Sequence, residues 1–291
     1  MTGTIYSNRN NFYKMFIKRN YNRKKFLNLT VVVPIHSKTT TKNFSKCLKS
    51  IFFSTFIPKE ILICVDGSIS KSLKKFINNY KNKNIKLLFL KKNVGLGRLL
   101  SVAIPKCRFN LIARLDSDEY TNSKRFEIQY NLLAKKKKLV LVGGYSKEIN
   151  KQNITLKKVP LNFAEIINFS QHRNPFNHST VMFRKKAVLA VGGYKHQPYF
   201  EDYLLWIKLI QKKNFMLNLP RVFSSSNIDI DFYKRRKGLE YFKHFLNFNN
   251  KVHKMGHINL NTYIINIFIR LSVFLPLIII RLMYMKFLRY D

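Results

Sequence analysis

Two carboxylates two residues apart are the strongest chemical signal in this chain. Asp116 and Asp118 follow directly on the apolar run at residues 111–115, which we expect to form a buried strand. Side chains at i and i+2 of an extended segment share one face, and ligands of α/β sheets bind at the carboxyl ends of strands. Oxygen ligands of this kind suit Mg²⁺ or Mn²⁺ carrying phosphate oxygens. A solvated acidic turn that caps a helix is the alternative, and these residues alone leave both open.

Two other clusters also lie at the boundaries of predicted elements. Asp66 follows an apolar run at residues 61–65, and its carboxylate could accept hydrogen bonds from a nucleobase or ribose, although an Asx turn uses the same residue type. Gly95 and Gly97 stand at the start of a predicted helix, where they let the backbone approach a ligand and where Arg98 could meet a phosphate. Each pattern is common in folded proteins, so neither identifies a function by itself.

A pair of acids opens a later predicted helix. Glu201 and Asp202 follow an aromatic-rich loop and precede Trp206, the only tryptophan of the chain. Acids in a first helical turn commonly interact with the helix dipole. A carboxylate held in a partly apolar pocket could also serve as a general base. The residues leave both interpretations open.

The segments that must position these clusters alternate between strand and helix patterns. Strands that alternate with helices of about ten residues predict βαβ units and a mostly parallel α/β sheet flanked by helices. The polar stretch at residues 147–158 is predicted to be a flexible loop near a ligand. Strands are expected at residues 29–34, 61–65, 85–90, 111–115, 139–142 and 179–183, and helices at 43–53, 73–80, 99–103, 124–133 and 202–210.

The composition is strongly basic. The 291 residues include 54 Lys and Arg against 14 Asp and Glu, a formal charge of +40. This excess favours polyanionic partners, namely nucleic acid, an anionic membrane surface or phosphorylated substrates, although compositional drift toward Lys accounts for part of it. Three widely spaced cysteines indicate neither a disulfide framework nor a zinc site and fit a reducing, cytosolic setting. Residues 1–28 form a basic extension without the apolar core of a secretory signal.

Residues 226–291 form a basic and apolar C-terminal region, which we expect to be helical and to associate with a membrane. In its apolar stretch at residues 263–288, only residues 271–280 separate Arg270 from Arg281, well short of the ~20 residues that a bilayer span needs. A Phe- and Tyr-rich amphipathic segment lying in the membrane interface fits this pattern. An ordinary helix that covers the core is the alternative.

The order of these motifs resembles that of family 2 glycosyltransferases. The resemblance extends over residues 29–218, and residues 174–184 and 191–194 are similar to the branch found in bacterial exopolysaccharide, capsule and O-antigen clusters, of the amylovoran-biosynthesis type. In chain order the motifs are VVVP at 31–34, VDGS at 65–68, NVGLG at 93–97, ARLDSD at 113–118 and EDYLLW at 201–206.

The resemblance implies a GT-A fold over residues 29–225. Its Rossmann-like, nucleotide-binding half would be residues 29–120, and its acceptor-binding half residues 121–225. By the same resemblance, Asp66 would meet the nucleotide base, and Asp116 the ribose or the metal–diphosphate region. Asp118 would bind the divalent metal, Mn²⁺ or Mg²⁺, on the diphosphate.

The resemblance also assigns the chemistry. Asp202 would be the general base that deprotonates the acceptor hydroxyl, in a reaction that inverts the anomeric centre. Two positions depart from the family pattern: Val65 stands where a second acid is frequent, and His36 where many relatives carry a Tyr or another polar residue. Nucleotide-sugar contacts are expected from Pro34, Asp66, Gly95, Arg98, Arg114 and Asp116, and acceptor or phosphate contacts from Glu201, His178, Trp206, Arg235 and Arg236.

Together these features predict an inverting, metal-dependent hexosyl- or N-acetylhexosaminyltransferase. The donor would be a nucleotide-diphosphate sugar, with UDP as the expected carrier, and the acceptor a saccharide that we expect to be lipid-linked. The enzyme would bind peripherally to the cytoplasmic face of the inner membrane. The alternatives are a basic nucleic-acid-binding protein, which no recognition-helix, zinc-finger or RNP-like motif supports, and an inactive glycosyltransferase-like scaffold.

Overall fold

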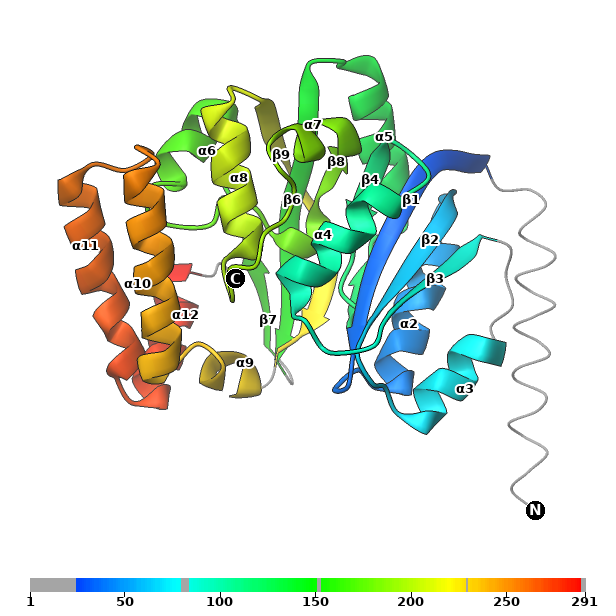
Figure 1. The fold of residues 1–291 in the computed structure, drawn as a ribbon, viewed down its shortest axis with the longest axis horizontal. Helices are drawn as coiled ribbons and strands as arrows, with labels where there is room; N and C mark the ends of the chain where they lie inside the picture. Colours follow the sequence, from blue (N-terminus) through cyan, green and yellow to red (C-terminus); the bar gives the residue numbers. More distant parts are fainter. Residues whose placement is uncertain (1–24, 80–83, 151–152, 229, 289–291) are drawn as a thin grey trace.

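The computed structural model describes residues 25–79, 84–150, 153–228 and 230–288 (Figure 1). The predicted basic extension at residues 1–28 therefore lies mostly outside the described residues. Its last four positions, 25–28, belong to the first strand, β1 (Lys25–His36). The sheet thus begins earlier than the predicted boundary at residue 29.

One half of the fold is a parallel sheet. β1 pairs in parallel with β2 (Phe56–Asp66) and with β4 (Leu111–Arg114), and β2 pairs in parallel with β3 (Ile85–Leu90). Both faces of β1, β2 and β4 are covered, which explains their nearly continuous apolar sequences, whereas the edge strand β3 is partly exposed. Because the strands are parallel, the segments that follow them all leave from one edge of the sheet.

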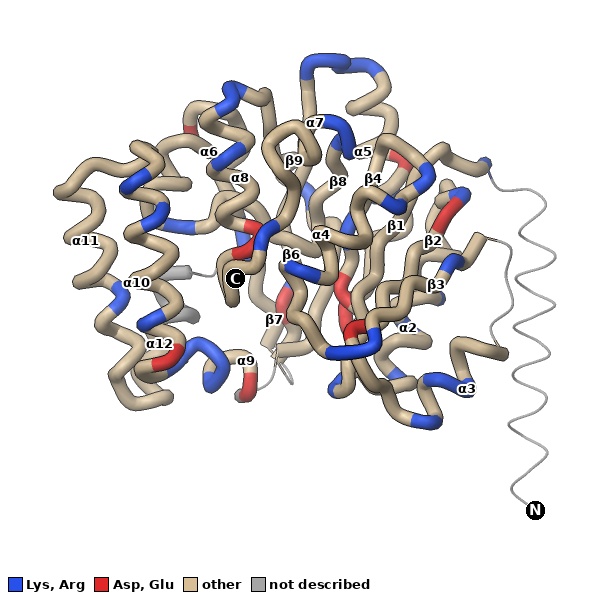
Figure 2. Tube along the Cα trace, in the orientation of Figure 1, with Lys and Arg blue, Asp and Glu red and all other residues tan. Residues whose placement is uncertain are grey.

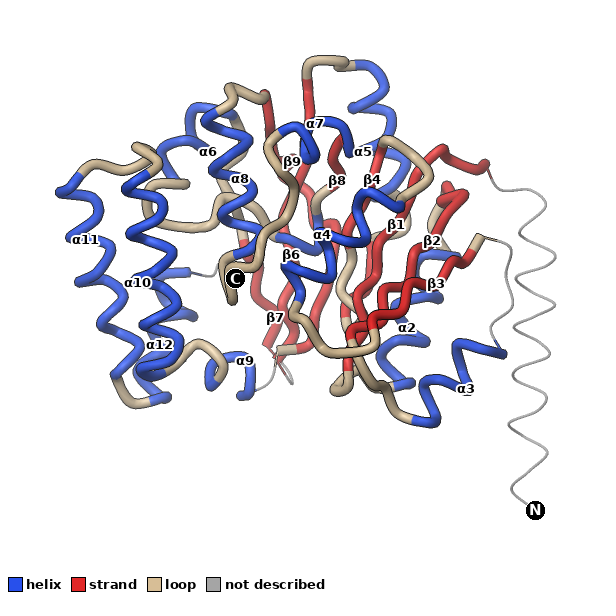
Figure 3. The backbone as a smooth tube through the Cα atoms, in the orientation of Figure 1, coloured by secondary structure: helices blue, strands red, loops and turns tan. Residues whose placement is uncertain are grey.

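In the described residues, the other half continues the same nine-stranded sheet (Figure 3), and its strands run in both directions. β8 (Met182–Arg184) runs antiparallel to both β4 and β6 (Leu139–Asn150) and thereby joins the two halves. β9 (Phe215–Asn227) lies beside β6 in parallel. Two short strands pair antiparallel at the margins: β5 (Glu119–Thr121) with β9, and β7 (Asn153–Lys157) with β6.

Helices cover both faces of the sheet. One core contains the apolar side of β1, including Val31 and Val33, under α2 (Thr41–Phe52), α3 (Lys71–Asn79) and α5 (Arg125–Lys135). Val32 points to the opposite core, as the period of a strand requires. That second core is covered by α4 (Leu96–Lys106), α6 (Phe163–Phe169), α7 (Lys185–Ala190) and α8 (Glu201–Gln211).

Three local predictions were wrong. Residues 147–158 are not a loop, because β6 continues to Asn150 and forms a hairpin with β7, with residues 151–152 outside the described part. The segment predicted as a strand at 179–183 begins as a 3₁₀ turn, His178–Thr180, before β8. β9 was not predicted, because its polar residues and proline have low strand propensity and only the pairing with β6 and β5 makes it a strand.

The C-terminal region is helical, as predicted, and partly belongs to the core. α10 (Gly238–Lys254) packs on α8 through aromatic side chains, and Phe248 lies 4.8 Å from both Phe200 and Tyr203 between ring centroids. α10 is therefore part of the core, and the predicted membrane association of residues 226–291 stays a prediction. The remaining elements are α9 (Ile230–Lys234), α11 (Leu260–Arg270), a 3₁₀ turn at Leu271–Phe274, and α12 (Leu277–Leu288).

The outer side of this region is strongly apolar. Phe268 and Ile278 expose 69% and 70% of their surface, and other large apolar side chains surround them. Arg270 interrupts the apolar sequence because it anchors α11: its Nη1 donates to the Tyr241 hydroxyl at 3.1 Å, and its guanidinium lies 4.4 Å from the Phe245 ring centroid. In the described part of the chain, no helix combines the length and apolar character that a bilayer crossing requires.

Candidate active site

Asp66 connects the end of β2 to the loop at residues 93–97, at the carboxyl edge of the sheet. Asp66 ends β2, and its two carboxylate oxygens accept hydrogen bonds from the backbone N–H groups of Val94 at 2.8 Å and Gly95 at 3.0 Å. A carboxylate offers about four lone-pair positions, so Asp66 keeps acceptor capacity for a ligand. Its predicted contact with the nucleotide base stays a prediction, and its contact with the 93–97 loop is a structural role that the sequence did not reveal.

The glycines of that loop are required for different reasons. Gly95 precedes α4 at φ +82°, a backbone conformation that residues with a Cβ rarely adopt, and a Cβ there would meet nothing within 4 Å. A Cβ at Gly97 would lie 2.4 Å from the backbone oxygen of Lys195 and 3.1 Å from the Glu201 side chain. Gly97 therefore permits contact between the starts of α4 and α8 and not the approach of a ligand. Arg98 is exposed on the first turn of α4, which leaves it accessible to a phosphate.

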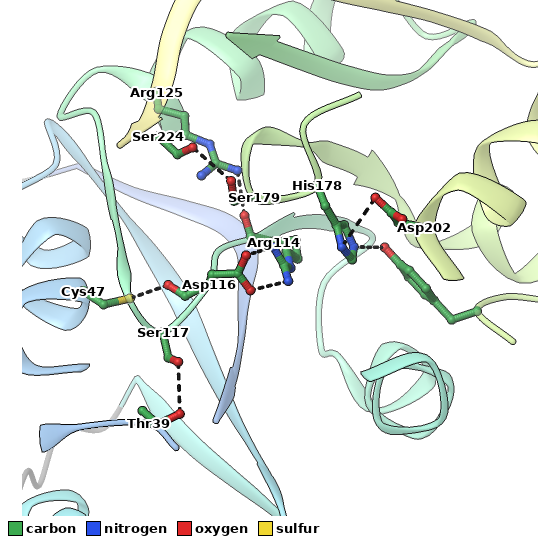
Figure 4. A network of polar contacts seen from close by, with 11 residues as sticks. Thr39, Cys47, Arg114, Asp116, Ser117, Arg125, His178, Ser179, Asp202 and Ser224 are labelled. Atoms are coloured by element: carbon green, nitrogen blue, oxygen red, sulfur yellow. Dashed lines mark hydrogen bonds and ion pairs between the residues drawn. The ribbon is translucent and has the colours of Figure 1, made fainter. Parts of the chain in front are cut away.

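The Asp116–Asp118 turn is fixed by polar contacts on several sides. Both carboxylate oxygens of Asp116 are paired with the buried Arg114 guanidinium. The Cys47 thiol donates to the backbone oxygen of Asp116 at 3.3 Å, and the Ser117 and Thr39 hydroxyls are 3.3 Å apart (Figure 4). The turn therefore has a defined orientation at the end of β4, with the Asp118 side chain directed to the exposed side.

The two aspartates fit a divalent cation of the magnesium type. The pKa of Asp118 is raised, mainly by desolvation and next by the charge of Asp116. The charges of Arg114 and Arg235 oppose this shift. A bound cation would relieve the repulsion between the two carboxylates. Among the described residues, no group of three or more His, Cys, Asp or Glu side chains could hold a metal. The protein would thus supply two oxygen ligands and leave the others to phosphate and water, as Mg²⁺ and Mn²⁺ sites commonly do.

A buried charged layer lies beneath this turn, and the sequence analysis did not identify it. Burial, followed by the charge of Asp116, raises the pKa of Glu119 to about 7. Arg125 is fully buried and donates from Nη2 to the backbone oxygens of Arg114 at 2.9 Å and Val181 at 3.1 Å. It thereby connects β4 to the segment that carries His178. The spacing of Arg125, Gln129 and Leu133 on one face of α5 is the signal that could have placed Arg125 inside.

Asp202, the predicted general base, is held by two hydrogen bonds. It opens α8, with Oδ1 accepting from the backbone N–H of Tyr203 and Oδ2 from the Asn174 side chain, both at 2.8 Å. Burial raises the pKa of Asp202, and these two hydrogen bonds oppose the shift. Its neighbour Glu201 is also affected: burial, followed by the charge of Asp202, raises the pKa of Glu201 to about 7. A base with a raised pKa accepts a proton more readily at neutral pH.

His178 stands beside Asp202 on the 3₁₀ turn before β8. Its Nδ1 lies 3.8 Å from Asp202 Oδ2, and its Nε2 lies 2.9 Å from the hydroxyl of Tyr194. Burial and the charge of Arg114 hold the pKa of His178 well below its usual range, so the ring is neutral. Figure 4 shows Arg114 between Asp116 on one side and His178 on the other. Arg114 and His178 thus lie between Asp116 and Asp202 in this view.

This arrangement of residues agrees with the family resemblance. Residues 30–192, more than half of the chain, match the sequence model of glycosyl transferase family 2. The chain belongs to this family. Family 2 membership makes it a glycosyltransferase and confirms the resemblance that the order of the motifs indicated.

Two bacterial glycosyltransferases are similar over most of their length. The amylovoran biosynthesis glycosyltransferase AmsE of Erwinia amylovora is 33% identical over 216 residues, which cover 74% of this chain and 81% of AmsE. The UDP-Gal:α-D-GlcNAc-diphosphoundecaprenol β-1,3-galactosyltransferase of Escherichia coli is 30% identical over 248 residues, which cover 84% of this chain and 90% of the relative. The branch of bacterial polysaccharide glycosyltransferases expected from the sequence is therefore confirmed.

A solved glycosyltransferase structure has the same fold. The mannosyltransferase PcManGT from Pyrobaculum calidifontis, solved in complex with GDP-Man and Mn²⁺, superimposes with a TM-score of 0.58 at 11% identity. The superposition covers 84% of this chain and 69% of that protein. The expected GT-A fold, an α/β sheet with helices on both faces, is confirmed.

The remaining predicted site residues of this glycosyltransferase have different surroundings. Trp206 is fully buried in the core beneath His178, which corrects the prediction that it contacts the acceptor directly. Pro34 is buried inside β1. Arg236 stacks on the Phe232 ring at 3.8 Å and donates to the Phe232 backbone oxygen, so its guanidinium is engaged locally. Arg235 is exposed and is close enough for its charge to act on Asp118.

Proposed function

We propose that this chain is an inverting, metal-dependent glycosyltransferase that moves a hexosyl or N-acetylhexosaminyl group from a UDP-sugar to a lipid-linked saccharide during synthesis of a cell-surface polysaccharide. One observation carries the proposal. In Figure 4, Arg114 and His178 lie between Asp116 and Asp202, a buried carboxylate with a raised pKa, and Asp118 follows Asp116 by two residues. A base on one side and a carboxylate site for a divalent cation on the other are the two parts that a metal-dependent single-displacement transfer requires.

The mechanism follows from the separation of the base, Asp202, from the Asp116–Asp118 pair. Asp202 removes the proton from the acceptor hydroxyl as the hydroxyl oxygen attacks the anomeric carbon of the donor, on the face opposite the departing diphosphate. Asn174 and the backbone N–H of Tyr203 hold the carboxylate in place during attack. A divalent ion held by Asp118 and Asp116 would supply neutralisation of the charge that develops on the diphosphate. Because attack and departure occur on opposite faces, the configuration of the anomeric carbon is inverted.

The donor and the acceptor are inferred from the relatives. The E. coli relative is named for transfer from UDP-Gal to a GlcNAc-diphosphoundecaprenol acceptor, and it aligns with 84% of this chain. The site of this chain suits a nucleoside diphosphate, because the exposed Arg235 is close enough for its charge to act on Asp118 and Arg98 is exposed on the first turn of α4. We therefore infer a UDP-sugar donor and an acceptor carried on a lipid diphosphate.

A lipid-linked acceptor requires contact with a membrane, and the apolar side of α11 and α12 could provide it. The elements are suitably placed, because α12 packs against α9, which directly precedes Arg235. Lys and Arg are distributed over the surrounding helices (Figure 2), and each basic residue near an anionic leaflet adds about 1 kcal/mol. We therefore infer peripheral binding to the cytoplasmic face of the inner membrane. The exposed apolar side chains of this surface are Ile264, Ile265, Phe268, Ile269, Leu271, Phe274, Leu275, Ile278, Ile279 and Leu282.

A donor screen tests the catalytic part of the proposal. The full chain is incubated with Mn²⁺, a panel of UDP- and GDP-sugars, and GlcNAc-diphosphoundecaprenol, and products are identified by mass. We expect one UDP-sugar to extend the acceptor by a single residue, with the reaction stopped by EDTA. Failure of every donor together with absence of Mn²⁺-dependent UDP binding would refute the enzyme and favour a scaffold or a nucleic-acid-binding protein. Binding to heparin would not separate these possibilities, because all of them predict it.

Flotation with liposomes tests the membrane part. Phe268→Glu and Ile278→Glu should reduce flotation with vesicles containing anionic lipid by at least about tenfold, because each places a charge in the apolar surface. Phe89→Glu is the matched control, since Phe89 is also exposed but lies on β3 at the opposite end of the molecule (Figure 1). Equal flotation of all three variants and the wild type would contradict docking through α11 and α12.

A further inference from the structure

We propose that His178 and Asp202 together form the binding site for the reacting hydroxyl of the acceptor, and that Tyr194 sets the tautomer of His178 that this site requires. His178 Nδ1–H donates a hydrogen bond to the hydroxyl oxygen, and Asp202 Oδ2 accepts the hydroxyl proton. The inference rests on the proposed function, because it names the atoms that hold the acceptor in that reaction. Tyr194 is a positioning residue and does not touch the substrate.

The tautomer follows from the surroundings of Tyr194. Its side chain is 1% exposed, and burial raises the pKa of its hydroxyl well above the usual range, so the hydroxyl stays protonated. A buried phenol hydroxyl needs an acceptor. Among the described residues, the partner of this hydroxyl is His178 Nε2, at 2.9 Å. A neutral imidazole has one donor and one acceptor nitrogen, so Nε2 accepts from Tyr194 and Nδ1 carries the proton.

The distance from His178 to Asp202 leaves room for one oxygen atom. Nδ1 and Oδ2 are 3.8 Å apart, which is too long for a direct hydrogen bond. A hydroxyl oxygen about 2.7 Å from Oδ2 and about 2.9 Å from Nδ1 completes a triangle with an angle of about 85° at that oxygen. Such an oxygen can donate to the carboxylate and accept from the imidazole at once. The two side chains have the same partial exposure, 11%, so a substrate can reach both.

Aromatic packing keeps the imidazole in this orientation. The ring centroids of His178 and Tyr194 are 5.6 Å apart, and the Trp206 ring lies 6.0 Å from His178 in an edge-to-face arrangement. Phe176 supports Trp206 from another side, with centroids 5.6 Å apart. All three supporting rings are buried, so the histidine has little freedom to rotate. Trp206 therefore has a structural role in the site, because it supports the His178 ring.

The bond changes balance without any further reagent. The acceptor O–H bond breaks and its proton moves to Asp202 Oδ2. The electron pair left on the oxygen forms the new bond to the anomeric carbon, while the bond from that carbon to the diphosphate oxygen breaks and its electrons remain on the diphosphate. His178 keeps its proton throughout and orients the attacking oxygen. Its low pKa prevents it from competing with Asp202 as a charged group.

The first test reads the tautomer directly and needs no turnover. Long-range ¹H–¹⁵N spectra of the full chain with ¹⁵N-labelled histidine distinguish Nδ1–H from Nε2–H rings, and the His178 signals are those lost in His178→Asn. We expect Nδ1–H at pH 7, and a shift toward Nε2–H in Tyr194→Phe. An Nε2–H ring or an imidazolium at pH 7 in the wild type would overturn the proposal, whatever reaction the enzyme performs.

The second test uses isosteric variants, because an Asn amide overlays Nδ1 of histidine and a Gln amide overlays Nε2. With GlcNAc-diphosphoundecaprenol as acceptor, His178→Asn should raise the acceptor KM less than about threefold, whereas His178→Gln should raise it about tenfold, the effect of one lost hydrogen bond. Tyr194→Phe should raise it about fivefold. The affinity for UDP should not change in any variant, since the donor contacts are elsewhere.

A matched control separates positioning from stability. Tyr241→Phe also removes a buried tyrosine hydroxyl, one that accepts from Arg270 in the C-terminal helices, and should leave the acceptor KM unchanged. Equal KM values for the Asn and Gln variants, or a Tyr194→Phe variant with a lower Tm but an unchanged KM, would refute the proposed hydroxyl site. A wild-type chain that transfers no sugar would instead refute the proposed function, and the spectra would still decide the tautomer.

Discussion

Replacing the proposed base by its isosteric amide separates its chemical role from its structural one. In Asp202→Asn the side-chain oxygen still accepts from the backbone N–H of Tyr203, but the new amide meets the Asn174 amide, which also donates. One hydrogen bond is lost, and two amide donors are left facing each other without an acceptor. Loss of a general base lowers kcat by about 10²–10⁴, which corresponds to ~2.7–5.4 kcal/mol of transition-state stabilisation.

The stability of the variant should change much less. An unsatisfied buried donor costs about 1–3 kcal/mol. This cost is offset because burial raises the pKa of Asp202, so the ionised carboxylate itself destabilises the folded chain. That destabilisation is absent below the pKa of the unfolded carboxyl, about 4, and grows as the pH rises through the folded pKa. The stability of Asp202→Asn relative to the wild type should therefore increase between about pH 4 and pH 7.

The assay combines transfer kinetics at saturating donor with thermal unfolding across this pH range. The double variant Asp202→Asn/Asn174→Asp is the control, because it exchanges carboxylate and amide and restores the hydrogen bond between them. We expect it to recover Tm but not kcat, since its carboxylate is at the wrong position. A single variant that keeps more than a tenth of wild-type kcat, or a double variant that recovers activity, would show that Asp202 is not the base.

Three further predictions concern other parts of the chain. Gly97→Ala should lower Tm far more than Gly95→Ala. The added Cβ at Gly97 would lie 2.4 Å from the backbone oxygen of Lys195, whereas at Gly95 only the φ of +82° opposes a side chain. Similar losses of Tm in the two variants would contradict this packing. Asp118→Asn should weaken Mn²⁺-dependent UDP binding at least about tenfold by calorimetry and leave metal-free binding unchanged, and an unaltered Mn²⁺ dependence would remove Asp118 from the metal site. Burial raises the pKa of Cys64 to about 12 and raises those of the other two thiols, so iodoacetamide at about pH 8 should modify all three cysteines only after unfolding; rapid labelling of the native chain would disprove their burial.

Much of the parallel half could be predicted from local sequence. The strand at 85–90 was predicted with its observed boundaries, and the helix at 202–210 within one residue at each end. Both segments have strong apolar periodicity. The elements that are close to them in the sequence also lie beside them in the fold. β9 could not be predicted in this way, because its partners β6 and β5 are distant in sequence and its own residues favour turns.

The carboxylates predicted for the site stay predictions, and the structure adds the contacts that hold them, which the sequence did not show. Asp66, Asp116 and Asp202 were identified because acids are scarce in this chain and these stand at the ends of apolar segments. The function of Arg114 as the partner of Asp116, and the position of Arg125 beneath it, needed the folded structure. A basic residue in so basic a chain carries little information until its burial is known.

The sequence by itself determined the family, the α/β class and the carboxylates of the site, because these depend on residue types in a fixed order along the chain. Only the tertiary structure decided which groups face one another. It placed Tyr194 and Asp202 on either side of the His178 ring, and it gave Gly97 a packing role in place of the expected contact with a ligand. Contacts between residues far apart in sequence arise from strand order and helix packing, and local patterns do not encode them.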